Sequence, residues 1–336
     1  MKQILSEIVF RLKRRPRVDS TTKQTTCGDT KRSPFKHGAS GAMVISTDFE
    51  LAWGWRFAKT NIDFITLARR ERDNISLLLE IFDMYKIPVT WATVGHLFLE
   101  RCERAPNGLP HPNMPRPPHF VNKWWKFESG DWYQHDPCTD FLRSPEWYAP
   151  DLVKKILKAK VKHEIALHSF SHIPFTRDIC SKELAEAEIK ESIELMRTFG
   201  IVPKSMIYPG GFKDYVEILH KFGIIAFRGD HRRRDVEMSY PFKVKGIWNI
   251  PATIGLSARK SWKTSYYVER IKRYIRRAIT HGVVFHMWFH PSIESSILRN
   301  VLPAILEYAD KQRQQGRLWI ATMQEIAIYC EARKLC

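Results

Sequence analysis

From Ala42 onward the sequence alternates short apolar runs with segments of helical periodicity, and this alternation is the strongest restriction on its fold. At least six such alternations favour parallel strands joined by crossover helices. No glycine-rich nucleotide loop follows the first apolar run, which favours a barrel over an open nucleotide-binding sheet. The expected strands are 42–47, 88–94, 164–168, 205–208, 224–228, 247–250, 283–289 and 319–322, and the expected helices are 75–85, 183–199, 215–222, 266–280 and 298–314.

The chain is expected to consist of a basic arm followed by one barrel. Residues 1–40 combine basic runs with a Ser/Thr/Lys stretch and offer little to a core, which predicts a flexible arm. A basic amphipathic helix on anionic lipid is the alternative for its first dozen residues. Residues 41–336 are a normal length for a single α/β barrel.

An aperiodic insert rich in Pro, Trp and His interrupts the barrel at about residues 104–148. It is too long for a plain connector, so it is either a functional cap or a disordered segment. Its aromatic residues favour a packed cap, and they are Trp124, Trp125, Trp132, Tyr133, Trp147 and Tyr148.

Charge and cysteine usage limit the partners and the compartment. The chain has 54 Lys+Arg against 36 Asp+Glu, a net charge of +18 that favours polyanions. No nucleic-acid-binding motif accompanies it, so we expect no specific nucleic-acid partner and keep peripheral contact with an anionic membrane open. Six cysteines without a C-x-x-C pair indicate reduced thiols and a cytoplasmic location, with the inner membrane face as an option. We expect no signal peptide and no membrane-spanning segment.

Three polar segments each follow an expected strand. They are residues 46–50 (Ser-Thr-Asp-Phe-Glu), 168–172 (His-Ser-Phe-Ser-His) and 286–291 (His-Met-Trp-Phe-His-Pro). The carboxyl ends of parallel barrel strands meet on one face, so these segments are expected to lie close together. Two histidines and a carboxylate leave coordination positions open for water and substrate, as in hydrolytic zinc centres. The three segments together predict a divalent-metal site.

These segments resemble the motifs of the polysaccharide deacetylase family, the NodB-homology or carbohydrate esterase family 4 group, over about residues 42–329. Residues 47–50 are a spaced form of a first motif that usually has two adjacent aspartates. Residues 168–172 match the His-Ser/Thr-x-x-His motif, and residues 208–211 (Tyr-Pro-Gly-Gly) match the third motif. Residues 90–95 and 322–327 look like the family's second strand and closing segment.

The resemblance implies a distorted (β/α)7 barrel and a set of residue roles. Asp48 would be the catalytic base, and Glu50, His168 and His172 would bind the metal, most simply Zn²⁺, with Co²⁺, Ni²⁺ or Mn²⁺ as alternatives. The Tyr208 backbone amide would help bind the oxyanion.

One family position departs from the pattern: Ile207 stands where an arginine often precedes the third motif, and Arg228 is the expected substitute.

The general acid and the substrate contacts are further expectations. The family's last motif places a general acid histidine after an apolar strand, and both His286 and His290 qualify because alternate strand positions share a face. His290 is preferred, since it precedes Pro291 at the expected strand end. The substrate is expected to contact Trp53, Pro209, Gly210, His286 and Trp288.

The expected activity is hydrolytic removal of an N-acetyl or N-formyl group from an amino sugar in polysaccharide or lipopolysaccharide biosynthesis. The substrate would be an N-acylated amino sugar, an oligosaccharide or a lipid-linked glycan. Two alternatives are a non-catalytic glycan-binding barrel and a hydrolase of another amide or ester, because the metal site dictates the bond type more than the substrate.

Overall fold

The computed structural model describes residues 35–229, 238–259 and 262–333. Most of the expected basic arm, residues 1–34, therefore lies outside the described residues. Phe35 and Ala39, also expected in the arm, are buried against the barrel, and the Phe35 ring stacks on Tyr240 with 5.3 Å between centroids. No described helix is both long and apolar enough to cross a bilayer.

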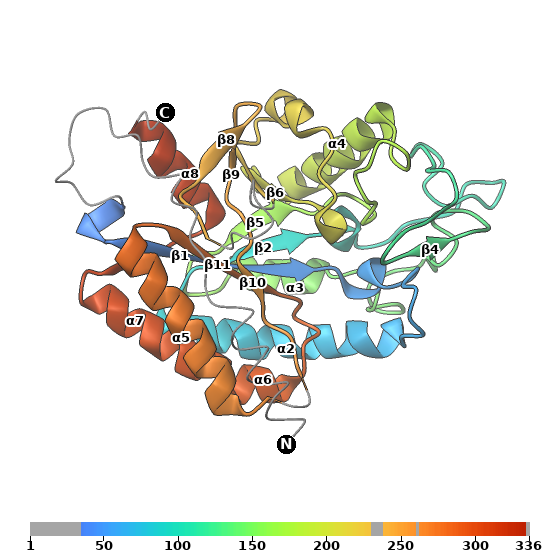
Figure 1. The fold of residues 1–336 in the computed structure, drawn as a ribbon. Helices are drawn as coiled ribbons and strands as arrows, with labels where there is room; N and C mark the ends of the chain where they lie inside the picture. Colours follow the sequence, from blue (N-terminus) through green and yellow to red (C-terminus); the bar gives the residue numbers. More distant parts are fainter. Residues whose placement is uncertain (1–34, 230–237, 260–261, 334–336) are drawn as a thin grey trace, which may run out of the picture.

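A curled, mostly parallel sheet forms the centre of the molecule (Figure 1). Its parallel strands follow one another around the sheet in chain order, and the last of them, β11, pairs with the first, β1. These strands are β1 (Gly41–Phe49), β2 (Thr90–Thr93), β5 (Glu164–Leu167), β6 (Ser205–Ile207), β7 (Ala226–Arg228), β9 (Ile247–Asn249), β10 (Ile254–Gly255) and β11 (Val284–Phe289).

One segment, residues 247–255, closes the ring of strands. Its first part, β9, pairs with β7, and its second part, β10, pairs with β11. Between them the Thr253 amide donates to the His286 carbonyl at 2.8 Å. Counting β9 and β10 as one stave gives the distorted (β/α)7 barrel that the family resemblance implied.

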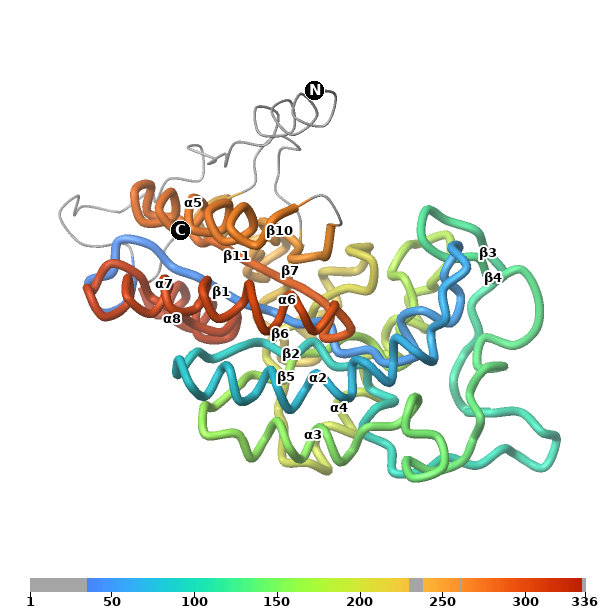
Figure 2. The backbone as a smooth tube through the Cα atoms, turned by 90° about the horizontal axis from the view of Figure 1, so that it is seen from below, coloured from blue at the N-terminus to red at the C-terminus, as the bar shows by residue number. Residues whose placement is uncertain are grey.

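Helices cover the outside of the barrel, and short strands add to its margins (Figure 2). Helix α5 packs against α7, and β12 pairs with the start of β1. The helices are α2 (Phe64–Tyr85), α3 (Pro150–Leu157), α4 (Lys182–Thr198), α5 (Thr264–His281), α6 (Ser295–Asn300), α7 (Leu302–Gln314) and α8 (Met323–Ala332). The remaining strands are β3 (Phe120–Val121), β4 (Lys126–Phe127), β8 (Phe242–Val244) and β12 (Leu318–Ile320). The 3-10 helices are η2 (Lys36–Gly38), η3 (Leu51–Gly54), η4 (Gly95–Phe98), η5 (Pro209–Gly211) and η6 (Val216–Phe222).

Two expected helices differ from the observed ones. Helix α2 begins at Phe64, eleven positions before the predicted start, because Asp63 caps it by accepting from the Thr66 amide. Its inward face carries the buried polar residues Glu71 and Asn74, which break the apolar period. The predicted helix 298–314 is two helices, α6 and α7, which meet at Val301 (φ −110°, ψ −50°).

The insert packs at the end of the barrel toward which β1 points (Figure 1). Among its aromatic residues Trp132, Tyr133 and Tyr148 are buried, whereas Trp124 is 49% exposed. Its regular structure is the short antiparallel pair β3 and β4. The insert therefore has an aromatic core that is continuous with that of the barrel.

His163, which precedes β5, makes stability depend on pH. Its Nδ1 accepts from the Val89 amide at 3.2 Å, and its Nε2 is buried without a partner among the described residues. Burial lowers the pKa of His163 to about 4. The unfolded chain, where histidine titrates near 6.5, therefore binds a proton first, so stability falls as the pH drops from about 6.5 to 4.

We expect His163→Gln to remove part of this acid sensitivity, because glutamine can still accept from the Val89 amide but does not titrate. Denaturant unfolding at pH 7 and pH 4.5 should show about 1 to 3 kcal/mol less loss of the unfolding free energy in the variant than in the wild type. An equal loss in both proteins would mean that other groups govern acid unfolding.

Candidate metal centre and active site

The end of β1 and the residue that follows it bring two carboxylates to the mouth of the barrel. Asp48 and Glu50 are two positions apart, and both are buried. The Glu71 carboxylate on α2 accepts from the Glu50 amide at 2.9 Å and from the Leu51 amide at 3.3 Å. Burial, followed by the nearby Glu50 carboxylate, raises the pKa of Glu71 to about 8. A buried polar residue of α2 thus holds the turn that positions Glu50.

Glu50, His168 and His172 converge on one point. Glu50 Oε1 lies 2.9 Å from His168 Nε2 and 3.0 Å from His172 Nε2, and the three side chains are at most 3% exposed. His168 Nδ1 donates to the Ile207 carbonyl at 2.7 Å, so in the neutral ring Nε2 presents a lone pair to the carboxylate. A cation between these atoms would satisfy all of them, and the donor set is one that binds divalent metals. The residues therefore fit a metal ion.

The histidine segment has a strained backbone that another buried carboxylate holds in place. Ser169 and His172 both adopt left-handed φ values, 56° and 59°. Glu188 on α4 accepts from the Phe170 and Ser171 amides at 2.8 Å each. Such strain persists only where the surroundings impose it, and it is concentrated at functional sites.

Asp48 does not join the histidines but pairs with Arg228 at the end of β7. The guanidinium donates to both carboxylate oxygens at 2.6 Å, in a bidentate arrangement. Burial acts to raise the pKa of Asp48, but the Arg228 charge and its hydrogen bonds outweigh burial and lower it. The Arg228 guanidinium also lies over the Trp288 ring, 4.8 Å from its centroid. The structure therefore places Arg228 on Asp48, where the sequence suggested a substitute cation.

His286 lies below the catalytic face, in a relay that ends at Asp48. Its Nδ1 donates to the Ile250 carbonyl at 3.1 Å, so its Nε2 accepts from the Ser46 hydroxyl at 2.8 Å. The Ser46 oxygen in turn accepts from Arg228 at 2.9 Å. Burial, followed by the Arg228 charge, lowers the pKa of His286 to about 3, which keeps the ring neutral.

His290 lies at the mouth, directly after β11 ends at Phe289. Its Nε2 is 3.5 Å from Glu50 Oε1, and its side chain is 28% exposed. Burial opposes its charged form, but the surrounding carboxylates, Glu50 first, raise the pKa of His290 to about 9. Donor atoms of Asp48, Glu50 and His290 all lie within 4.8 Å of one another.

The third motif lies against the insert, where Gly210 meets the Trp125 ring. Tyr208 is buried, and its ring packs against Phe175 at 5.5 Å and Phe227 at 6.0 Å. Pro209 and Gly210 follow in the 3-10 helix η5. Trp125 of the insert reaches across, with its ring 5.3 Å from the His172 ring.

The expected tryptophan contact needs a correction. Trp53 is 1% exposed and packs between the barrel and the insert, with its indole N–H donating to the Trp147 carbonyl at 3.1 Å. The side chain near the site is instead Trp55, whose ring lies 5.1 Å from that of His290. The two tryptophans lie in one short turn after Glu50. The apolar periodicity of the sequence therefore cannot show which of them faces the site.

Gly210 offers a direct test of the contact between the third motif and the insert. A Cβ at Gly210 (φ 61°) would meet Trp125 Cη2 at 2.5 Å, whereas one at Gly211 (φ 77°) would meet nothing within 4 Å. Both alanine variants carry the same left-handed strain, of order 1 kcal/mol. We therefore expect Gly210→Ala to raise KM or lower kcat at least tenfold and Gly211→Ala to leave both nearly unchanged. Equal effects would exclude a role for the Trp125 contact.

A buried cluster of a carboxylate and two histidines beside a second carboxylate is an arrangement found in metal-dependent hydrolases. The family model described as polysaccharide deacetylase matches residues 64–224, which include both metal-site histidines and the third motif. Residues 64–224, just under half of the chain, are thus similar to that family. Asp48, Glu50, Arg228 and His290 lie outside the matched segment, so their place in the site comes from the geometry above.

Solved structures share this fold at low sequence identity. A protein classed as a polysaccharide deacetylase from Mycobacterium smegmatis is 15% identical with a TM-score of 0.60, over 91% of this chain and 96% of that one. Another from Pseudomonas aeruginosa PAO1 is 12% identical with a TM-score of 0.58, over 92% and 97%. The allantoinase Puue is 15% identical with a TM-score of 0.58, over 94% and 98%. A search of curated protein sequences found no match.

Proposed function

We propose that the protein is a hydrolase that uses a divalent metal to remove an N-acetyl or N-formyl group from an amino sugar. The observation that carries this proposal is the Asp48–Arg228 pair beside the converging Glu50, His168 and His172. The Asp48 carboxylate is held in its ionised form by Arg228. It lies close to the three proposed metal ligands but is not one of them. A base and a metal site in one buried cluster are what amide hydrolysis requires.

In this proposal Glu50, His168 and His172 hold the ion, most simply Zn²⁺, although Co²⁺, Ni²⁺ or Mn²⁺ would also suit the donors. A bound divalent ion supplies Lewis acidity and lowers the pKa of water. The Ile207 carbonyl orients the His168 ring through its Nδ1 proton, as outer hydrogen bonds commonly do for metal-binding histidines.

The other residues of the site move protons and stabilise charge. Asp48 accepts the proton of the attacking water, and Arg228 keeps Asp48 ionised until then. The Tyr208 amide donates to the acyl oxygen as it gains negative charge, a contribution commonly worth 100-fold or more in rate. His290 gives its proton to the leaving nitrogen, so that the amine departs neutral.

The aromatic side chains around the mouth favour a sugar ring as the substrate. Trp55 and Trp288 lie near His290 and have partly exposed rings on which a pyranose can stack. We therefore favour an oligosaccharide or a lipid-linked glycan of polysaccharide or lipopolysaccharide biosynthesis. The corresponding location is the cytoplasm, with the inner face of the membrane as an option.

Two other functions remain as candidates for the same site. A non-catalytic glycan-binding barrel would have no use for an ionised Asp48 or a charged His290, so we rank it below catalysis. A hydrolase of another amide is the second candidate, because the fold shared with an allantoinase does not select the substrate.

The deciding experiment incubates the purified, metal-loaded protein with N-acetylated and N-formylated nucleotide sugars, lipid-linked sugars, oligosaccharides and allantoin. Released acetate, formate and ring-opened product are measured, with Asp48→Asn as the inactive control. Release from sugars alone supports the proposal, whereas product from allantoin alone would replace it. No release, with glycan binding that is equal in both proteins, would indicate a binding barrel.

The metal ligands can be tested separately from activity. We expect His168→Ala and His172→Ala each to lose one equivalent of divalent metal, because each removes a buried donor to the ion. The control is His163→Gln, which changes a half-buried histidine away from the site. Unchanged metal content in both alanine variants would exclude this set of ligands.

A further inference from the structure

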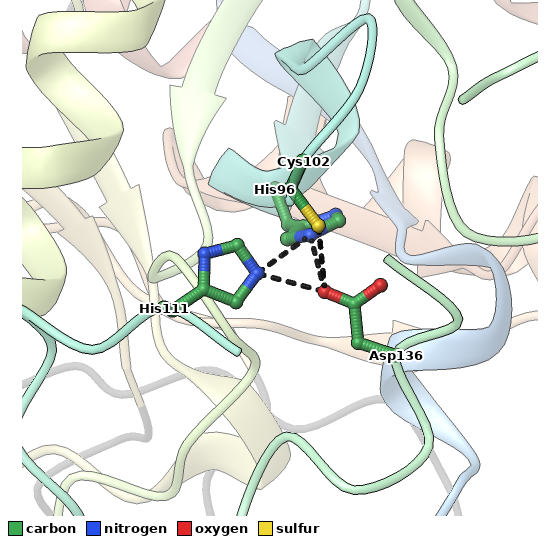
Figure 3. A group of neighbouring side chains, drawn as sticks. All are labelled: His96, Cys102, His111 and Asp136. Atoms are coloured by element: carbon green, nitrogen blue, oxygen red, sulfur yellow. Dashed lines mark hydrogen bonds and ion pairs between the residues drawn. The ribbon is translucent and has the colours of Figure 1, made fainter. Parts of the chain in front are cut away.

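A second group of potential metal ligands lies outside the proposed active site, between the insert and the barrel (Figure 3). His96 belongs to η4, directly after β2 of the barrel, while Cys102, His111 and Asp136 come from the connection that follows and from the insert. Their donor atoms all lie within 4.8 Å of one another. We propose that His96, Cys102, His111 and Asp136 bind a second divalent metal ion of the Zn²⁺ type, which fastens the insert to the barrel.

The donors lie slightly closer together than in a tetrahedral zinc site. His96 Nε2 lies 3.1 Å from His111 Nε2 and 3.0 Å from Asp136 Oδ2. Asp136 Oδ2 is also 2.7 Å from His111 Nε2 and 3.4 Å from Cys102 Sγ. A Zn²⁺ ion with bonds of about 2.0–2.3 Å requires donors about 3.3–3.6 Å apart, so small outward shifts would complete its shell. His, Cys and carboxylate are all common zinc ligands.

Hydrogen bonds within this group cannot satisfy all four side chains well. His96 Nδ1 must donate to the Trp147 carbonyl, 3.2 Å away, so in the neutral ring Nε2 carries a lone pair. That lone pair faces both a carboxylate oxygen and the nitrogen of a second imidazole. A proton on His111 Nε2 would have to serve both neighbours at once, whereas a cation would satisfy the four donors together.

The remaining atoms of these ligands are held by the hydrogen bonds that metal sites usually have. Asp136 Oδ1 accepts from the Tyr148 hydroxyl at 2.9 Å and from the Cys138 amide at 3.0 Å. Its other oxygen is thereby directed at the centre. His111 reaches the group from a left-handed backbone conformation, φ 46°, which its surroundings must impose. Outer contacts of this kind orient ligands and fix their tautomers.

The arrangement indicates a structural site and not a second catalytic one. All four tetrahedral positions would be filled by protein donors, and the side chains of His96, Asp136 and His111 are 0%, 0% and 11% exposed. Closed, buried sites of this kind stabilise the fold. The His96 ring packs on Trp53, 4.3 Å away, in the turn that follows Glu50. The ion would therefore hold the insert, including Trp125, over the proposed active site.

A thiolate ligand distinguishes this site from the first, which contains no cysteine. We would load the reduced full-length protein with Co²⁺ and record the thiolate-to-cobalt charge-transfer band in the near ultraviolet, together with metal content. Wild type should bind two equivalents and show the band. Cys102→Ser should lose the band and one equivalent, and His111→Ala, changed at a half-buried position, should lose one equivalent. Cys138→Ser is the matched control and should retain both.

The double variant His168→Ala/His172→Ala separates this inference from the proposed function. It should keep the band and one equivalent of metal. If wild type binds one equivalent that Cys102→Ser loses, the second site stands and the proposed catalytic metal fails. If wild type shows no band and Cys102→Ser has the same metal content as wild type, the second site is excluded.

Discussion

Asp48→Asn is expected to lower kcat by about 10² to 10⁴-fold while leaving the metal content unchanged. The reason is positional: Asp48 binds Arg228 through both oxygens, while Glu50 contacts the two histidines. Asparagine keeps the size of the side chain but cannot accept the proton of the attacking water. The measurement is the rate of acyl release at saturating substrate, normalised to folded protein, alongside metal analysis.

The matched variant is Glu50→Gln, the other carboxylate of the same turn. It should lose metal from this site as well as activity, because the Glu50 carboxylate oxygen is the atom that both histidine Nε2 atoms approach. Asparagine at position 48 leaves the Arg228 charge less well compensated, so both variants need a check of folding. Metal loss in Asp48→Asn with retention in Glu50→Gln would exchange the two roles.

The second large effect is expected at His290. His290→Gln should lower kcat by about 10² to 10⁴-fold, because glutamine has no proton to give to the leaving nitrogen. His286→Gln should cost far less, since His286 is a positioning residue that reaches Asp48 only through Ser46 and Arg228. Burial also keeps its pKa near 3, so it has no proton to donate at neutral pH.

Substrates with different leaving groups sharpen this comparison. An activated ester leaves without protonation, so His290→Gln should retain much more of its rate on the ester than on the amide. His286→Gln should show the same ratio as wild type on both substrates. If His286→Gln instead lost the amide reaction selectively, the general acid would be His286.

The architecture was accessible from the sequence because buried parallel strands leave a strong apolar signal. Each strand listed from Ala42 to Thr322 has a counterpart in the structure within a few residues. The polar residues at the carboxyl ends of β1 and β11 and directly after β5 meet because the carboxyl ends of parallel strands share a face. The departure at Ile207 was also readable, since Arg228 lies at the end of the neighbouring strand and pairs with Ile207 in register.

Features that depend on contacts between irregular segments left no such signal. The inward polar residues Glu71 and Asn74 interrupt the apolar pattern in the first half of α2, so the sequence did not predict that half. Both side chains bind loops: Asn74 donates to the carbonyls after β11, and Glu71 accepts from the amides after β1. The ligands of the second group have no regular spacing. They come together only because the insert folds back onto η4.

The pairing of β1 with β11 has a consequence for how a nascent chain acquires this site. Ser46 and His286 form a hydrogen bond although they are 240 positions apart. Strand β1 therefore cannot complete its pairing until β11 has been synthesised. Until residues 284–289 leave the ribosome, the edge of β1 that will bind β11 remains an open template for other strands. Synthesis at about 5–20 residues per second leaves that edge uncovered for many seconds. Overproduction should therefore increase the demand for chaperones and cause aggregation. Slower translation or a lower temperature should raise the soluble yield.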